Sequence, residues 1–284
     1  MKQIRIENIS AYEQCSTFVN GFRGDAVFSD PMLSTEEQLR TNLTDGIRKP
    51  QNHAVLGVYR QTQMIGLFAF LVLREEQYLE MLVGLSRDAD AYSEIFAYLE
   101  RHYPAYHGDF VFNPNNYLLK EILIRKGAEF DTEQQKMVLT HSVSVTDTGG
   151  VVLLSERYKQ QYFAIHNQDL YWTAEKVAAA ADRFRVFLAI ENDKVVGYLD
   201  VSCCHDENEP YDFLVLPPYR KKGYGRKLLA KALQMNAPKG MMLLIEVDNT
   251  PAIRLYESMG FETAENQNSL TTHWILPQSS NKGE

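Results

Sequence analysis

An internal repeat restricts the fold of this chain more than any other feature, because its two halves carry the same order of predicted elements. In the second half, alternating and apolar runs predict strands at 185–191, 195–202, 211–216 and 241–247, with helices at 224–237 and after residue 250. The first half predicts strands at 53–60, 64–73, 78–85 and 109–112, with helices at 91–102 and 117–126. Gly66 occupies the place in the first copy that Gly197 occupies in the second. This repeat predicts two tandem domains of one mixed α/β fold.

The ends of the two copies also correspond. Aligning Gly127 with Gly260 places Asn116 on Asn249, just ahead of the final helix in each copy. In the second copy we expect Thr250 to cap that helix, since proline follows it as the first helical residue. The predicted domains are residues 1–146 and 150–284, and a stretch rich in Thr, Asp and Gly at 146–150 is the predicted linker.

Composition excludes several classes of protein. Apolar residues make up 45% and charged residues 23%, a globular balance, and the formal net charge of −8 disfavours nucleic acid as a partner. There is no uncharged apolar run of about 18 residues, so we expect no membrane span, and the first ten residues lack the apolar stretch of a signal peptide. Three cysteines predict a reducing, cytoplasmic location. Cys203, Cys204 and His205 lack a chelating spacing, so no metal is predicted.

The residues that indicate chemistry are concentrated at 214–229. A strand leads into a loop with two glycines, Gly223 and Gly225, and the loop opens a helix. Glycine lets a backbone approach a ligand closely, and free amides at a helix start bind phosphate. Positive charge is concentrated in this segment of an acidic protein, on Arg220, Lys221, Lys222, Arg226 and Lys227. We therefore predict an anion site here; the alternative is a basic helix start behind a flexible turn.

The second half resembles the GCN5-related N-acetyltransferase (GNAT) family. That family carries an (Arg/Gln)-x-x-Gly-x-(Gly/Ala) loop, which Arg220, Gly223 and Gly225 match. A second family block follows the next strand and is matched by Asn249, Ala252, Leu255, Tyr256, Gly260 and Phe261. The resemblance covers the chain from about residue 151 onward, and the first half only by its element order. It implies an acyltransferase of α/β fold, with two tandem acyl-CoA N-acyltransferase domains and acetyl-CoA as the acyl donor.

The resemblance also implies roles for individual residues. The coenzyme A pyrophosphate would be held by the loop and helix start, formed by Arg220, Lys221, Lys222, Gly223, Tyr224, Gly225 and Arg226. The strand before the loop would splay from its neighbour, and the main chains of Leu214, Val215 and Leu216 would bind the pantetheine arm. An amide near Val215 would stabilise the developing oxyanion. Asn249 would contact the cofactor near the pantetheine; alternatively it is a turn residue.

Tyr256 is the implied acid that protonates the departing thiolate; the alternative is a core aromatic on a short helix. A thiol and a phenol have reference pKa values of about 8.5 and 10, so this proton transfer is not steeply uphill. Glu209 is the candidate base, because it falls where histone-modifying members of the family carry their base glutamate. It also belongs to an acidic run of the kind that usually forms a solvated turn, and water could serve instead.

Other residues could line the acceptor cleft. Tyr211 and Asp212 follow Glu209 on the strand, and His273 and Trp274 lie on the predicted last strand, where they are more often core or edge residues.

The first copy departs from the family pattern. Its equivalent loop has no Gly-x-Gly and carries Asp88 and Asp90, which would repel a pyrophosphate, and Leu123 stands where the second copy has Tyr256. We therefore expect a degenerate, non-catalytic domain at 1–146 and an active one at 150–284.

The predicted function is acetyl transfer from acetyl-CoA to an amine by direct attack. The acceptor is expected to be a small-molecule amine, with a protein amine as a second possibility, and the oligomeric state is left open. A coenzyme A-binding sensor or regulatory module is the alternative. A different nucleotide-binding protein is disfavoured, because Gly-x-x-x-x-Gly-Lys and a full dinucleotide fingerprint are absent.

Overall fold

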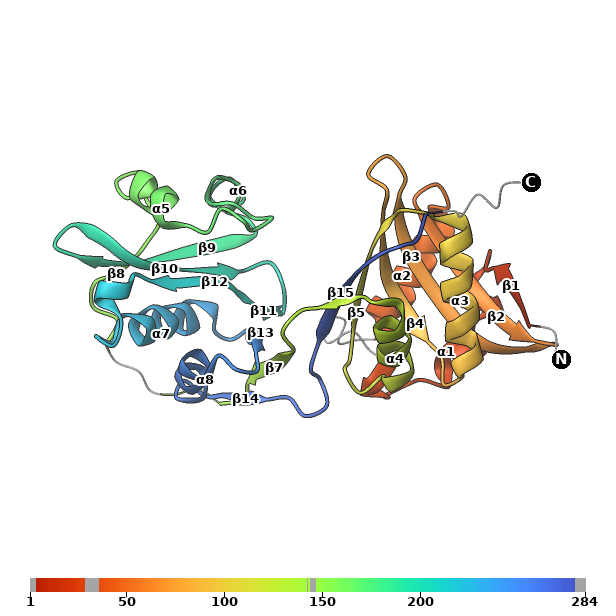
Figure 1. Cartoon of the computed structure of the whole chain (residues 1–284). Helices are drawn as coiled ribbons and strands as arrows, with labels where there is room; N and C mark the ends of the chain where they lie inside the picture. Colours follow the sequence, from red (N-terminus) through yellow and green to blue (C-terminus); the bar gives the residue numbers. More distant parts are fainter. Residues whose placement is uncertain (1–3, 29–35, 142, 144–146, 279–284) are drawn as a thin grey trace. The chain divides into compact units, whose positions relative to one another are not determined.

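A computed structural model describes residues 4–28, 36–141, 143 and 147–278 of the chain (Figure 1). The chain divides into two compact units. Unit 1 consists of Met1–Gln134 together with Glu265–Glu284, and unit 2 of Gln135–Ala264. The predicted mixed α/β class is confirmed, because both units combine sheets with helices. No helix within the described ranges is both long and apolar enough to cross a membrane.

The boundaries differ from the predicted ones, because each half of the chain supplies a strand to the other unit. Strand β7 (Gln134–Leu139) follows the first half, yet it pairs antiparallel with β14 (Phe261–Thr263) in unit 2. Strand β15 (Leu270–Ile275) comes from the C-terminal segment, yet it lies in the sheet of unit 1, between β5 (His107–Phe112) and β6 (Glu129–Phe130). Composition alone does not reveal such pairing.

The predicted linker at 146–150 also differs. Thr146 lies outside the described residues, whereas the following residues bond to unit 2. Lys227 Nζ lies 2.9 Å from Asp147 Oδ2, and the amide of Ile190 donates to the carbonyl of Gly150 at 2.8 Å. Residues 147–150 are therefore a turn of unit 2.

Unit 1 is built on a seven-stranded sheet of order β1-β2-β3-β4-β5-β15-β6. Its first strands are β1 (Ile4–Asn8), β2 (His53–Arg60), β3 (Gln63–Leu73) and β4 (Tyr78–Leu85). Neighbours run antiparallel except β4 and β5, which are parallel.

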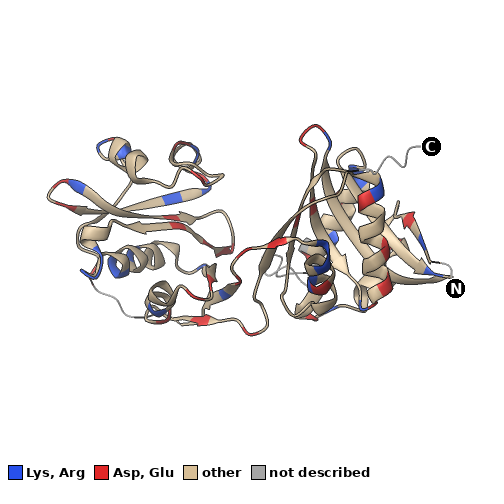
Figure 2. Cartoon of the chain, viewed as in Figure 1, with Lys and Arg blue, Asp and Glu red and all other residues tan. Residues whose placement is uncertain are grey.

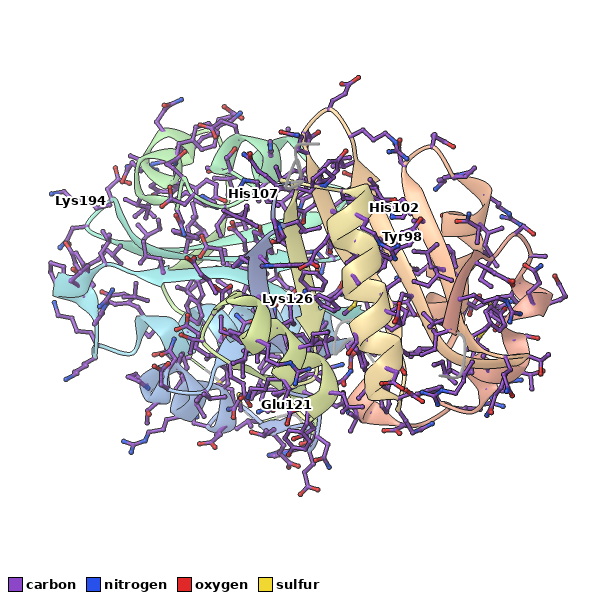
Figure 3. The ribbon with its side chains drawn as sticks, turned by 45° about the vertical axis from the view of Figure 1, so that its right-hand side comes forward. Tyr98, His102, His107, Glu121, Lys126 and Lys194 are labelled. Carbon is purple, nitrogen blue, oxygen red and sulfur yellow. The ribbon has the colours of Figure 1, made fainter. Side chains whose placement is uncertain are left out.

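Helices cover both faces of this sheet. Helices α3 (Ala89–His102) and α4 (Tyr117–Lys126) lie side by side on one face (Figures 1 and 3), where an ion pair joins Lys126 to Glu100. The first segments are η1 (Tyr12–Gln14), α1 (Ser16–Asn20), η2 (Ala26–Phe28) and α2 (Glu36–Arg48). They pack on the other face, where Leu43 of α2 joins a cluster with Val55 and Leu67. Successive side chains of β2 and β3 point to opposite faces of the sheet, so these strands contribute to the hydrophobic cores on both faces.

Unit 2 contains two four-stranded sheets. The first has the order β12-β10-β9-β8 and consists of β8 (Val151–Leu153), β9 (Phe184–Glu191), β10 (Lys194–Ser202) and β12 (Pro210–Val215). The second has the order β11-β13-β7-β14 and adds β11 (Glu207–Asn208) and β13 (Gly240–Glu246). Helices α5 (Lys159–Ile165) and α6 (Ala174–Ala179) cover one face of the first sheet. Helices α7 (Tyr224–Asn236) and α8 (Thr250–Glu257) pack in the core on the other side (Figure 1).

The predicted elements are present in both halves, with ends that shift by one or two residues. The prediction missed the strands β1, β6, β7, β8, β11 and β14 and the helices α1, α2, α5 and α6. Helices α5 and α6 have only seven and six residues, too few to show a helical period.

The repeat extends to fine detail in the hairpins. In unit 1 the pairing shifts between Val58 and Tyr59 so that Ile65, just before Gly66, is left over. In unit 2 the pairing shifts in the same way, so that Val196, just before Gly197, is left over. A β-bulge at equivalent places in two hairpins shows that the two copies share one backbone design.

The caps of the final helices correspond as well. Asn116 Oδ1 accepts from the amide of Leu119 at 3.3 Å, and Asn249 Oδ1 accepts from the amide of Ala252 at 3.4 Å. The prediction that Thr250 caps α8 was therefore wrong, because Thr250 is its first helical residue and Asn249 is the cap.

Candidate active site

Strand β12 has an open edge, because β12 and β13 belong to different sheets. The amide of Leu216 donates to the carbonyl of Val196 at 2.9 Å, and the carbonyl of Leu214 also lies against β10. Since main-chain groups alternate in direction along a strand, those of Val215 point to the open edge. Its carbonyl accepts from Arg220 Nε at 3.0 Å, which leaves its amide facing outward.

Of the three residues predicted to bind the pantetheine arm through their main chains, the structure leaves only Val215 with a main-chain amide directed to the open edge. The main chains of Leu214 and Leu216 serve the fold instead: both pair with β10, and the carbonyl of Leu216 accepts from Tyr219. Val215 alone of the three predicted residues presents its amide to the open edge.

The loop after β12 contains consecutive main-chain amides that have no hydrogen-bond acceptor among the described residues. It passes through a short 3₁₀ turn, η3 (Pro217–Tyr219), and then takes positive φ at Lys221 (59°) and Gly223 (88°). The first paired amide of α7 is that of Lys227, which donates to the carbonyl of Gly223 at 3.1 Å. The amides from 221 to 226 have no acceptor among the described residues. Free amides at a helix start, with the helix dipole behind them, form an anion site.

The basic side chains of this loop differ in their partners, and Arg220 Nε donates to the carbonyl of Val215. Arg220, Lys221 and Lys222 are exposed, and Lys222 Nζ lies 5.1 Å from the centre of the Tyr219 ring. Arg226, by contrast, donates to Ser258 Oγ at 3.0 Å, after the end of α8. Figure 2 shows these positive residues gathered at the start of α7.

Two further loop residues have structural partners. Tyr224 donates its hydroxyl hydrogen to Glu191 Oε1 at 2.6 Å, and this bond holds the helix start to β9. A Cβ at Gly225 would meet Leu255 Cδ2 at 3.3 Å and Phe213 Cζ at 3.5 Å. A larger side chain at 225 would therefore fill the space beside the free amides.

Tyr256 of α8 combines a buried ring with an unbonded hydroxyl. The residue is only 5% exposed and its ring contacts those of Phe213 and Phe261 edge-on, at 6.4 and 5.3 Å between centroids. Among the described residues, the one fully buried side-chain oxygen without a partner is Asp200 Oδ1, so the unbonded Tyr256 hydroxyl keeps access to solvent. Burial, and then the charge of Glu209, raise the pKa of Tyr256.

Glu209 lies between β11 and β12 and is not part of a solvated turn. Its main chain is fixed by Ser202, whose hydroxyl accepts from the Glu209 amide at 2.7 Å. Burial raises the pKa of the Glu209 carboxyl to about 7. A carboxyl that titrates near neutral pH is suited to accept a proton from an amine.

Some predicted site residues lie elsewhere. His273 and Trp274 belong to β15 and hence to unit 1. His273 lies 2.7 Å from Asp109 and 3.3 Å from Asp131, and Trp274 is buried in the core. Asn249 remains in unit 2, where its side chain caps α8.

Unit 1 satisfies the equivalent helix start with its own side chains. Asp88 Oδ1 accepts from the amide of Asp90 at 2.9 Å, and Arg60 binds both oxygens of Asp88 at 2.7 and 3.0 Å. Asp90 pairs with the same arginine at 2.7 Å. Leu123, the counterpart of Tyr256, is fully buried. At the start of α3, unit 1 therefore has a carboxylate at the position where the start of α7 in unit 2 has unpaired amides.

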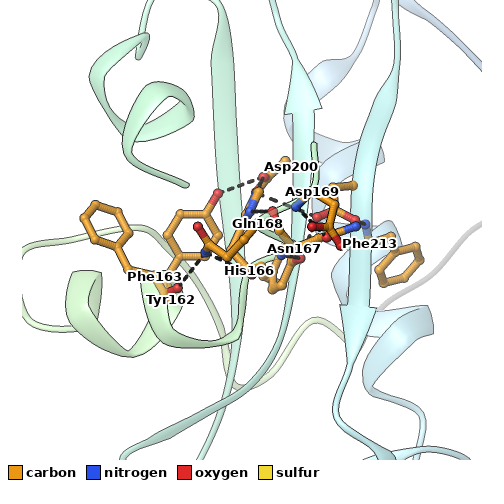
Figure 4. Close-up of polar contacts among 10 residues, drawn as sticks. Tyr162, Phe163, His166, Asn167, Gln168, Asp169, Asp200 and Phe213 are labelled. Atoms are coloured by element: carbon orange, nitrogen blue, oxygen red, sulfur yellow. Dashed lines mark hydrogen bonds and ion pairs between the residues drawn. The ribbon is translucent and has the colours of Figure 1, made fainter. Parts of the chain in front are cut away.

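Sequence reasoning missed a buried polar network in unit 2. His166, Asp200 and Asp212 offer ligand atoms within 4.8 Å of one another, the arrangement that a metal site would need. His166 Nδ1 donates to the carbonyl of Asn167 at 2.7 Å, and Nε2 lies 3.0 Å from Asp200 Oδ2 (Figure 4). No spacing in the sequence marks this group, because its members come from three separate elements.

Comparisons with known proteins relate the second half of the chain to acetyltransferases. Residues 182–263 match the acetyltransferase (GNAT) domain family. The chain is 26% identical over 119 residues to aminoglycoside N(6')-acetyltransferase type 1 of Salmonella typhimurium, covering 38% of this chain and 82% of that protein. It is 29% identical over 97 residues to the ribosomal protein bS18-alanine N-acetyltransferase of Escherichia coli, covering 33% of this chain and 66% of that protein.

Solved structures show the same fold across both halves. A GCN5-related N-acetyltransferase from Sphaerobacter thermophilus superposes with a TM-score of 0.60 at 11% identity, over 82% of this chain and 85% of that one. A tandem GNAT protein from the clavulanic acid biosynthesis pathway gives 0.56 at 10% identity, over 98% of this chain and all of that one. The first half is thus GNAT-like in fold. The chain is an acyltransferase enzyme, and its residues 182–263 form an acetyltransferase (GNAT) domain.

Proposed function

We propose that unit 2 binds acetyl-CoA and transfers its acetyl group directly to an amine. The observation that carries this proposal is that one unit holds Tyr256, a tyrosine with an unbonded hydroxyl, close enough to the Glu209 carboxyl for the charge of Glu209 to raise the tyrosine pKa. A binding module that only senses coenzyme A needs neither an acid nor a base. Enzymatic transfer is therefore the better account of these two groups.

The free amides from 221 to 226 fit the pyrophosphate of coenzyme A. The exposed side chains of Arg220, Lys221 and Lys222 add positive charge around them. Gly225 keeps the backbone accessible, since a side chain there would meet Leu255 and Phe213. Arg226 would take part only through the donors that Ser258 leaves free.

The open edge of β12 fits the pantetheine arm and the acetyl carbonyl. The amides of the arm can hydrogen-bond to the strand edge, and its thioester is the group that reacts. The outward amide of Val215 would donate to the carbonyl oxygen, whose negative charge grows as the amine attacks. A fixed donor at this point stabilises the transition state more than the ground state. Asn249 caps α8 through Oδ1, and its Nδ2 would be the atom that contacts the cofactor.

Glu209 and Tyr256 would move the protons. Glu209, as carboxylate, would take the proton from the attacking amine, directly or through water. Tyr256 would give its proton to the departing sulfur; its raised pKa keeps the hydroxyl protonated at neutral pH.

The acceptor would be a cationic small-molecule amine, with a protein amine second. Relatives named for aminoglycoside and for ribosomal protein alanine acetylation both act on amines, which supports the reaction type and leaves the acceptor open. A carboxylate beside the reacting position favours an acceptor that arrives as an ammonium ion.

Calorimetry with acetyl-CoA, followed by thiol release with kanamycin, spermidine and an alanine-initiated peptide, tests the proposal. We expect one acetyl-CoA site per chain and turnover with at least one amine. Absence of binding at millimolar acetyl-CoA would overturn it, and binding without turnover on any primary amine would favour the sensor.

A further inference from the structure

Two carboxylates face each other across adjacent strands in the core of unit 2. Asp200 of β10 and Asp212 of β12 are direct partners in the antiparallel register. Like charges in this position destabilise a sheet unless a cation lies between them. The side chain of Asp200 is fully buried, and that of Asp212 is 17% exposed.

The cation is His166, the residue that follows α5. Its Nε2 lies 3.0 Å from Asp200 Oδ2 and 3.7 Å from Asp212 Oδ2. Nδ1 faces the carbonyl of Asn167 and must donate, so a second ring proton, on Nε2 toward Asp200, makes His166 a cation. Burial alone would lower the pKa of His166, but the hydrogen bond to Asp200 and its charge raise it.

Two tyrosines complete the network. Tyr162 of α5 donates to Asp200 Oδ2 at 2.7 Å, and Tyr198 of β10 donates to Asp212 Oδ2 at 2.5 Å. The amide of Asn167 in turn donates to the Tyr198 hydroxyl at 3.2 Å. Figure 4 shows Tyr162 and His166 beside Asp200, to which both bond. The network therefore fixes the beginning of the segment 166–173, which joins α5 to α6.

The other end of this segment packs in one cluster with Tyr211 of β12, the strand that begins directly after Glu209. The rings of Trp172 and Tyr211 both pack against Phe184, at 5.0 and 5.8 Å between centroids. Tyr211 is the extra residue of a β-bulge, between the pairs Val201–Pro210 and Asp200–Asp212. The bulge places Tyr211 on the same face as Asp212, two residues from Glu209.

We propose that His166 is a positioning residue for the acceptor: by bridging Asp200 and Asp212 it fixes residues 167–172 against Tyr211, beside Glu209, as the surface that presents the amine. This inference rests on the proposed function for its kinetic consequence. It assigns no proton transfer to His166, whose proton stays within the buried network. Disturbing the network should therefore weaken acceptor binding and leave the cofactor site, on the far side of β12, unchanged.

The variant His166→Gln tests this, because glutamine keeps a donor but brings no charge to the two carboxylates. His141→Gln is the matched control, since His141 is an exposed histidine of the same unit. We expect hydrogen exchange of the 167–172 amides to rise roughly tenfold. The acceptor KM, measured with whichever amine of the panel the wild type acetylates, should rise more than kcat falls, and acetyl-CoA affinity should stay within about twofold.

The double variant His166→Gln/Asp200→Asn separates positioning from simple loss of folding. Removing one carboxylate restores the charge balance, so protection of 167–172 and the acceptor KM should return toward the wild type. Unchanged exchange and KM in His166→Gln would overturn the inference, as would an equal loss of acetyl-CoA affinity. If the wild type does not bind acetyl-CoA, the proposed function fails, and the exchange measurement still decides whether His166 positions the segment.

Discussion

The carboxyl of Glu209 lies close enough to Tyr256 for its charge to raise the pKa of the tyrosine hydroxyl, in addition to the larger effect of burial. Glu209 lies between β11 and β12, and Tyr256 lies on α8. An acid that stays protonated and a base that titrates near pH 7 are thereby held in one place. This pairing gives the clearest tests of the mechanism.

Replacing Tyr256 by Phe should lower kcat by roughly 10²-fold, because the variant retains the ring and loses only the proton donor. The buried ring contacts with Phe213 and Phe261 should hold α8 in place. Thiol release measures kcat, and calorimetry should show acetyl-CoA affinity within about twofold of the wild type. A variant with full activity would show that another group or water protonates the thiolate.

The pH profile of Glu209 follows from its raised pKa of about 7. A base works as the carboxylate, so kcat/KM should rise as the pH rises through about 7. Glu209→Gln should be slower by roughly 10²-fold at pH 8 and should lack this ascending limb. If the limb persists in the variant, it belongs to the amine or to another residue.

The same shift makes a prediction about stability. A raised pKa means that folding favours the neutral carboxyl, so this contribution is present below its unfolded pKa and is lost as the pH rises through about 7. Glu209→Gln should therefore unfold at a higher temperature than the wild type at pH 8 and show little difference at pH 4. Thermal unfolding at the two pH values measures this, and a penalty at pH 8 would contradict it.

The helix starts of the two units offer a matched pair of variants. The second residue of α7 is Gly225, and the second residue of α3 is Asp90. Gly225→Asp should make unit 2 resemble unit 1 and weaken acetyl-CoA binding by at least about 100-fold, since a carboxylate repels the pyrophosphate. Asp90→Gly should leave the single-site titration unchanged, because Asp88 still occupies the amides of unit 1. A second site in the wild type would show that unit 1 binds the cofactor as well.

Because β7 and β15 each pair within the unit that the other half of the chain mainly forms, the structure predicts which fragments fold. A fragment of residues 135–264 contains every strand of unit 2, including β7. A fragment of residues 150–284 lacks β7 and carries β15, whose partners are in unit 1. We expect cooperative thermal unfolding by circular dichroism from the first fragment only. Equal cooperativity from the second would mean that β15 can replace β7.

The sequence predicted those features of the protein that depend on residues close together in the chain. The hairpins, the helices α3, α4, α7 and α8 and the loop from Arg220 to Gly225 are specified within short windows, and all were predicted. The cap of α8 was assigned to the residue beside the right one, because Asn249 and Thr250 are both good caps and only the backbone geometry separates them. Glu209 was proposed from position alone, and only burial decided that it lies outside a solvated turn.

The sequence by itself determined the class of fold, the repeat and the anion loop, because a period of two or 3.6 and a strand–loop–helix order are local properties. Tertiary structure alone decided which strand completes which sheet, since Thr272 bonds to Phe110 across 162 residues. It also decided which amides of β12 stay free and that His166 bridges Asp200 and Asp212. These outcomes depend on pairing and burial between distant segments, which no local pattern of residues specifies.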